Sequence, residues 1–243
     1  MITHSMARSK PNTATSPRSE FWAGARDTFP LVVGAIPFGI IFGTLAAGSG
    51  LSFAGTVAMS AFVFAGSSQF IALGLIAAAT SWPFIILTSF VVNLRHALYS
   101  ATLAPQVKHL SAGWQIPLAF WLTDETFVIA ANRYNRGDAS PHKHWYWLGS
   151  AIFMYTNWQL CTWLGLTVGQ LIPDAAAWGL DFAMPVTFLG MVVPYLKSRP
   201  MLAAVVVSGV VAVLAYPMPN KLGLIVAAVA GIVAGIVAEK MRR

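Results

Sequence analysis

Long apolar runs constrain this chain more than any other feature of its sequence. A helix that crosses a hydrocarbon core roughly 30 Å thick needs about 20 mostly apolar residues, because its backbone groups find no water there. The sequence contains eight such runs and therefore predicts an all-α integral membrane protein of about eight transmembrane helices in a lipid bilayer. The predicted spans are Thr28 to Gly48, Leu51 to Ala79, Trp82 to Leu103, Trp114 to Ala131, Trp145 to Ile172, Ala176 to Leu196, Pro200 to Tyr216 and Lys221 to Ala238.

The scarcity of charge supports this class. Of 243 residues, 57% are hydrophobic and 9% are charged, whereas about 25% of a soluble protein's residues are charged. The net charge of +7 does not indicate nucleic acid as a partner, because the basic residues fall between apolar runs and not along a polar face. The single cysteine, Cys161, lies in an apolar run without metal-ligand neighbours, so we expect no internal disulfide, metal or cofactor.

The basic residues also predict the orientation of the chain. Residues 1–27 are polar and lack the apolar core of a signal peptide, so we expect a disordered cytoplasmic tail ahead of a membrane domain at 28–243. Positively charged loops stay in the cytoplasm. With both termini inside, twelve Lys and Arg residues are cytoplasmic and two, Lys108 and Lys221, are outside.

Three charged residues fall inside predicted spans. Helical rise places Arg95 roughly 20 Å along the third span and Asp124 roughly 15 Å along the fourth, so both lie near the bilayer centre. A charge there costs at least about 2.5 to 3.5 kcal/mol, which favours pairing or a wet cavity. Asp124 and Glu125 are about 100° apart on a helix, so one is expected to neutralise Arg95 while the other faces a transport path that Asn93 and His96 line. The alternatives are an ion pair that only fixes helix register, and a histidine that only links helices.

Two predicted spans contain helix-breaking residues. The second includes glycine and two serines within Phe64 to Phe70, and the sixth has Pro185 between Phe182 and Phe188. Both segments read Phe-Ala-x-x-x-x-Phe, 118 residues apart. This predicts two parallel halves of four spans with broken second and sixth helices, an arrangement that marks a transporter's binding site. The alternatives are that the second span is a re-entrant hairpin, or that both breaks are packing kinks.

Together these motifs resemble the AzlC family, also called the YgaZ type. The resemblance runs from about residue 26 to the end and is carried by Asn93-Leu94-Arg95-His96, by Leu122-Thr123-Asp124-Glu125, and by the segments at Phe64 to Phe70 and Asp181 to Pro185. The stretch from Phe29-Pro30 through Gly39 to Phe42-Gly43 and the continuation of the Asn93 segment through Ala97-Leu98-Tyr99 also carry it. The resemblance implies the large subunit of a permease in the bacterial cytoplasmic membrane that exports valine and similar branched-chain amino acids. It also implies a small membrane subunit of the AzlD or YgaH type and coupling to the proton gradient.

A branched-chain amino acid is a zwitterion with an apolar end, and the sequence offers groups for each part. Either the broken helices or Arg95 would bind the carboxylate, Asp124 or Asp181 the ammonium group, and Glu125 the coupling proton. The broken helices contribute Ser67, Ser68, Gln69 and Pro185, and the apolar pocket would be formed by Phe64, Phe70, Phe182 and Phe188.

Other functions have less support in the sequence. An intramembrane enzyme would need a motif such as His-Glu-x-x-His, Gly-x-Ser-x-Gly or a phosphate-binding glycine loop, and the chain has none of these. We therefore predict that it is not an enzyme. A channel would favour rings of like charge over one cluster of mixed sign. A channel or a carrier for another small zwitterionic or hydrophobic solute remains the alternative.

Overall fold

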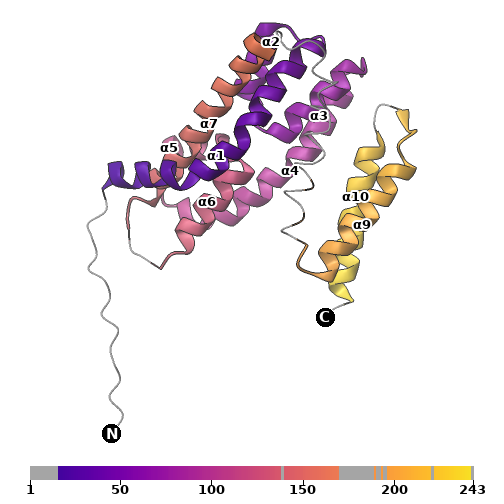
Figure 1. Cartoon of the computed structure of the whole chain (residues 1–243). Coiled ribbons are helices and arrows are strands. Elements are labelled where there is room, and N and C mark those ends of the chain that lie inside the picture. Colours follow the sequence, from indigo (N-terminus) through magenta and orange to yellow (C-terminus); the bar gives the residue numbers. More distant parts are fainter. Residues whose placement is uncertain are drawn as a thin grey trace.

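The computed structural model describes residues 16–137, 140–169, 189, 193, 196–219 and 222–241. Every regular element within these residues is an α-helix (Figure 1), as the apolar runs predict. The helices are α1 (Pro17–Gly48), α2 (Phe53–Phe62), α3 (Gly66–Ala77), α4 (Trp82–Val107), α5 (Ala112–Phe120), α6 (Asp124–Asn135), α7 (Lys143–Val168), α9 (Arg199–Leu214) and α10 (Leu222–Lys240).

Three of these helices, α1, α4 and α10, are long and apolar enough to cross a membrane by length and composition alone. Helix α7 has a similar length of 26 residues, or about 39 Å. Helix α1 begins at Pro17, with Ser16 as its N-cap. The expectation of a disordered tail over residues 1–27 is therefore wrong for 17–27, because the Ser-Pro pair is a helix-start signal. Residues 1–15 lie outside the described part of the chain.

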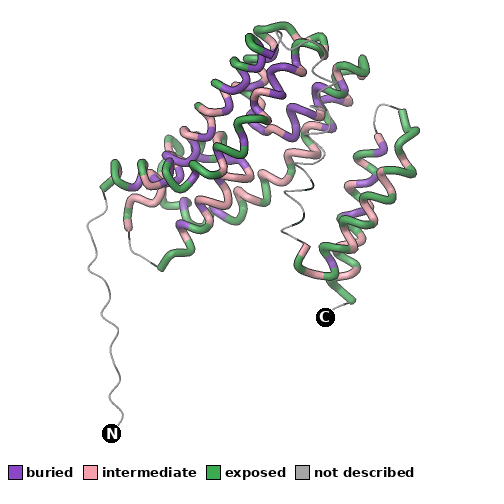
Figure 2. The backbone as a smooth tube through the Cα atoms, viewed as in Figure 1, coloured by how far each residue is buried: buried purple, intermediate pink, exposed green. Residues whose placement is uncertain are grey.

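Helices α1 and α7 form the centre of the bundle and run parallel to each other. Near the start of both helices, Thr28 Oγ1 donates to Ser150 Oγ at 2.7 Å. Near their ends the two backbones touch, since a methyl group on Gly165 would lie 2.1 Å from the carbonyl oxygen of Ile40 and 2.9 Å from Cα of Gly43. Glycines at Gly43 and Gly165 thus allow the two helices to approach closely. Figure 2 shows the buried residues gathered along these two helices.

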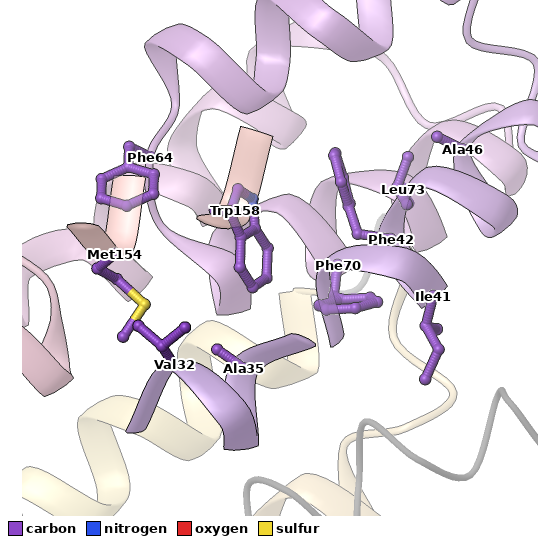
Figure 3. Packing of buried hydrophobic residues seen from close by; sticks show 10 residues of the cluster. All are labelled: Val32, Ala35, Ile41, Phe42, Ala46, Phe64, Phe70, Leu73, Met154 and Trp158. Atoms are coloured by element: carbon purple, nitrogen blue, oxygen red, sulfur yellow. The ribbon is translucent and has the colours of Figure 1, made fainter. Parts of the chain in front are cut away.

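Helices α2 and α3 form a re-entrant hairpin and not a second crossing. Helix α2 leaves the end of α1, and α3 returns to that same end, where Leu73 packs beside Phe42 and Ala46 (Figure 3). Residues Val63 to Ala65 between them are not helical. The predicted break in this segment is confirmed. The predicted crossing from Leu51 to Ala79 is wrong, because both ends of the hairpin lie at one end of the bundle.

Helices α5 and α6 form a second hairpin that enters from the opposite end. Trp114 at the start of α5 packs on the rings of His144 and Trp145 at the start of α7, with ring centroids 4.6 and 4.8 Å away. At the end of α6, Arg133 pairs with Glu20 in the first turns of α1. The predicted fourth span is therefore also wrong as a crossing. It is two half-helices with Trp121 to Thr123 between them.

The first 136 residues thus contain two units of the same kind in opposite orientation. Each unit is a crossing helix followed by a re-entrant hairpin, α1 with α2 and α3, then α4 with α5 and α6. The sequence predicted a parallel repeat of two four-span halves, and the described residues instead place an inverted pair within the first half. The sixth predicted span lies almost entirely outside the described residues, so its break is not described.

One end of the bundle, which we call the basic face, is where α1 and α7 begin and α4 and α6 end. Lys108 follows α4, and its neighbours Val107 and Leu110 pack with Trp147 of α7. The prediction that Lys108 lies on the opposite side from Arg133 is therefore wrong, because two hairpins replace two crossings. The basic face carries Arg18, Arg26, Lys108, Arg133, Arg136 and Lys143.

Helices α9 and α10 pair with each other as a separate hairpin beside α4 (Figure 1). Gly231 faces Ser208, and Gly235 faces Ala204. The Gly-x-x-x-Gly pair of α10 is therefore used for packing within the chain. Figure 2 shows much of this hairpin as exposed, which suits helices that face lipid.

Candidate functional site

The two hairpins converge on Arg95, which lies in the middle of α4. Arg95 Nη1 is 2.7 Å from Asp124 Oδ2 at the start of α6. Arg95 Nη2 donates to Ser67 Oγ at the start of α3, at 2.5 Å. One guanidinium therefore bridges half-helices that enter from opposite ends of the bundle. The predicted pairing of Arg95 with one of the two adjacent acids is confirmed, and the acid is Asp124.

Tyr99 completes this group from the next turn of α4. Its hydroxyl donates to Asp124 Oδ1 at 2.7 Å, so each carboxylate oxygen of Asp124 has its own donor. The Tyr99 ring stacks on Phe127 at 4.4 Å and meets His96 edge-on at 5.9 Å. The Arg95 and Asp124 side chains are 26% and 24% exposed. The pair is thus held in place while remaining open to a small molecule.

The N-termini of α3 and α6 differ in how their free N–H groups are satisfied. Helix α6 begins with a capping box, because Thr123 and Thr126 exchange side-chain to backbone hydrogen bonds. Asp124 and Glu125 add negative charge to its first turn. Helix α3 has Ala65 at its N-cap, which provides no side-chain cap, and no acidic residue in its first turn. Of these two helix starts, only that of α3 has backbone N–H groups without a side-chain cap or a nearby acid within the described residues. An anion would therefore bind at α3 and not at α6.

Seven buried polar side-chain atoms have no hydrogen-bond partner among the described residues. They are Oγ of Ser68, Oδ1 of Asn93, Nε of Arg95, Nε2 of His96, Nε1 of Trp121, Nε1 of Trp147 and Nδ2 of Asn157. Ser68 is fully buried in the first turn of α3. Buried polar groups without a partner are costly and call for water or a ligand. Arg95 itself and Ser68, the neighbour of Ser67, are among them, which is consistent with a site for a polar molecule at the ion pair.

Three predicted site residues contribute to packing instead. Gln69 is buried, accepts from Trp158 Nε1 at 3.0 Å and donates to the carbonyl of Val63 at 2.7 Å. Its amide therefore holds the α2–α3 break against α7. Phe64 stacks edge-on against Tyr155, and Phe70 meets Phe42 in the same way. Both phenylalanines belong to the hydrophobic core between the first hairpin and α1 and α7 (Figure 3).

Four other predicted site residues fall outside the described part of the chain, so the structure does not place them. These are Asp181, Phe182, Pro185 and Phe188. Glu125 is half-buried in the first turn of α6, next to Asp124.

The sequence analysis missed Tyr99 and the helix start at Thr123. A threonine followed by Asp and Glu is a recognisable helix N-terminus. That signal was available but lay within an apolar run long enough to be a single span. Tyr99 lies four residues after Arg95, so it could have been placed on the same helix face.

The fold and the site together define a class. The chain is a multi-pass helical membrane protein in which two pairs of half-helices meet at the Arg95–Asp124 ion pair. Comparison with known proteins identifies the particular family. The AzlC protein family model matches residues 30–172, and the chain belongs to this family.

Several relatives align over most of their length. An uncharacterized membrane protein of Archaeoglobus fulgidus is 34% identical over 219 residues, which cover 87% of this chain and 92% of that protein. The inner membrane protein YgaZ of Escherichia coli is 30% identical over 236 residues, covering 93% and 89%. The branched-chain amino acid transport protein AzlC of Bacillus subtilis is 26% identical over 182 residues, covering 73% and 70%. No solved structure matches the chain. The family points to a membrane transporter and not to an enzyme.

Proposed function

We propose that this chain is the large subunit of a two-component secondary transporter that exports branched-chain amino acids. The observation that carries the proposal is the Arg95–Asp124 ion pair between the starts of two half-helices. An intramembrane pair of opposite charges is expensive and is a functional site by default. The Bacillus subtilis relative is named a branched-chain amino acid transport protein, which supports the substrate class.

The arrangement suits a zwitterion because it offers one cationic and one anionic side. The substrate carboxylate would bind at the uncapped start of α3, where Ser67, Ser68 and the guanidinium of Arg95 converge. The substrate ammonium group would replace Arg95 beside Asp124, with Tyr99 holding the carboxylate in position. The bound amino acid would thus lie between Arg95 and Asp124. In the empty site these two side chains contact each other directly. Both substrate charges are compensated within the membrane.

Glu125 is the proposed carrier of the coupling proton. It adjoins Asp124 but points in a different direction, because successive helix positions are about 100° apart. The carboxyl group of Glu125 would gain and lose the coupling proton without disturbing the contact between the substrate ammonium group and Asp124. The small AzlD-type subunit is part of the same proposal and follows from the family resemblance.

We further propose that the basic face is cytoplasmic in the bacterial inner membrane. The Lys and Arg residues at this face support the orientation, because such residues are retained in the cytoplasm. The loops at the opposite end, at residues 49–52 and 78–81, contain no Lys or Arg. Export would then take the substrate from the basic face to the other end.

Labelled valine efflux tests the proposal. Cells that express the chain together with an AzlD-type subunit should lose preloaded labelled valine faster than cells with either protein alone, and an imposed pH gradient should change the rate. Asp124→Asn should abolish this efflux while membrane insertion is unchanged. Normal efflux by the Asp124→Asn variant would show that Asp124 binds neither substrate nor proton.

A matched control and a double variant sharpen the test. Thr102→Ala removes an exposed hydroxyl on the same helix as Arg95 and should transport normally, because within the described residues this hydroxyl bonds only to the carbonyl of Leu98 in its own helix. Arg95→Ala should reduce transport. Partial recovery in the Arg95→Ala, Asp124→Ala double variant would measure the coupling within the pair. Saturation and counterflow in vesicles separate a carrier from a channel, and competition by unlabelled amino acids defines the solute.

A further inference from the structure

A second group of charged residues lies at the basic face, away from Arg95. A cleft of about 380 Å³ opens there between α1, α6 and the start of α7. The sequence analysis assigned no role to it. It is lined by Arg26, Asp27, Pro30, Ile129, Asn132, Arg136 and Tyr146.

Only some of the charged atoms in this cleft form hydrogen bonds or ion pairs with other described residues. The Tyr146 hydroxyl donates to Asp27 Oδ2 at 2.5 Å, and Arg136 Nη2 lies 3.6 Å from the same oxygen. Oδ1 of Asp27 has no hydrogen-bond partner within the described ranges, and neither does the Arg26 guanidinium. An open carboxylate oxygen and an open guanidinium therefore adjoin one another in one cleft.

Pro30 adds both an apolar surface and a further acceptor. A proline inside a helix has no N–H, so the carbonyl of Arg26 loses the hydrogen bond that residue 30 would otherwise donate. Helix α1 bends between its first turns and its main length (Figure 1), as expected at a proline. Ile129 adds a second apolar side chain to the lining. The cleft thus combines an anion, a cation and apolar surface, which are the three features that an aliphatic amino acid matches.

The cleft is aligned with the central site along one face of α6. Glu125, Ile129, Asn132 and Arg136 follow each other at spacings of four, three and four residues, which places them on a single helix face. The eleven residues from Glu125 to Arg136 span about 16 Å. A solute that leaves the cleft along this face would arrive beside Glu125, the residue next to Asp124.

We infer that this cleft is a second binding site for the amino acid zwitterion, occupied before the central site when substrate comes from the basic face. Asp27 Oδ1 and the Arg26 carbonyl bind the ammonium group, the Arg26 guanidinium binds the carboxylate, and Pro30 and Ile129 contact the aliphatic side chain. The inference rests on the proposed function. Because Arg136 and Asp27 are 58% and 38% exposed, binding here is weak and affects capture of substrate more than its translocation.

Valine uptake into membrane vesicles of both orientations tests this site. Everted and right-side-out vesicles containing the chain and an AzlD-type subunit would be assayed with labelled valine for KM and maximal rate. Asp27→Asn and Arg26→Gln should each raise KM about two- to fivefold in everted vesicles, where the basic face is outside. The maximal rate in everted vesicles should be unchanged. In right-side-out vesicles the ratio of maximal rate to KM should fall by the same factor, because a substitution does not change the transport equilibrium that links the two directions. Arg18→Gln removes an exposed charge from the same face and serves as the control, and Arg26→Lys should retain part of the affinity.

The outcomes separate the inference from the proposed function. If the wild type transports valine and the two variants have wild-type KM values on both sides, the second site is refuted and the central site stands. A KM increase of the same size with Arg18→Gln would also refute it, because a general charge effect would explain both increases. If the wild type moves no valine in either orientation, both proposals are wrong.

Discussion

Replacing Gly43 with alanine should force α1 and α7 apart. A Cβ atom at Gly43 would lie 2.2 Å from the carbonyl oxygen of Thr162 and 2.8 Å from the backbone nitrogen of Leu166. Even close carbon to oxygen contacts in proteins are about 3.3 Å or longer. The two backbones must therefore separate by about 1 Å, since neither obstructing atom belongs to a flexible side chain.

The size of the effect follows from a matched pair of variants. Gly34 is in the same helix, and a Cβ atom there would have no neighbour within 4 Å. Both substitutions gain the same helix propensity, about 0.5 to 1 kcal/mol. The difference between Gly43→Ala and Gly34→Ala therefore isolates the overpacking cost, about 1 to 3 kcal/mol. For a chain of this size that corresponds to roughly 2 to 12 °C in melting temperature.

The measurement is thermal melting of the purified protein in detergent, followed by tryptophan fluorescence and by the loss of the monodisperse peak on gel filtration. Gly34→Ala should melt at or slightly above the wild-type temperature, and Gly43→Ala below it. Equal melting temperatures for the two variants would refute the backbone contact between α1 and α7.

Three further substitutions have specific expected results. Trp158→Phe leaves the buried carbonyl of Gln69 without its donor and should cost about 1 to 3 kcal/mol of stability by the same melting assay, whereas an unchanged melting temperature would contradict the bond. Thr123→Val removes the α6 cap and should cost about 0.5 to 2 kcal/mol in that assay; a loss of transport without a loss of stability would instead give Thr123 a direct role. Tyr99→Phe frees one oxygen of Asp124 and should change KM for valine in vesicle assays, so wild-type kinetics would exclude Tyr99 from positioning Asp124.

The sequence predicted the helical class because the cost of an unpaired backbone in lipid leaves few alternatives. It did not distinguish a crossing from a re-entrant hairpin. A run such as Trp114 to Ala131 is apolar enough for either, and the choice depends on where its two ends pack. Trp114 meets Trp145 through contacts between residues distant in the chain, which local hydropathy does not report.

For the candidate site, the sequence predicted the charged pair but not the role of the aromatic residues. Arg95 and Asp124 were identified because charges inside apolar runs must be compensated, and their pairing is observed. Phe64 and Phe70 were assigned to a pocket because of their motif, but their rings complete the core. The motif specifies residue type and spacing, whereas burial depends on which helix lies opposite. The open carboxylate at Asp27 had no signal beyond a polar segment at the start of the chain.

The contact between Thr28 and Ser150 joins residues 122 positions apart, so α1 is synthesised long before its partner. At about 5 to 20 residues per second, α7 leaves the ribosome roughly 6 to 24 s after α1. During this interval the glycine surface of α1 is covered by lipid or by the insertion machinery, and it cannot be covered by the surface that finally packs on it. The native neighbour of α1 therefore docks only after α2 to α6 have been made, and truncations that stop before α7 would leave α1 inserted without it.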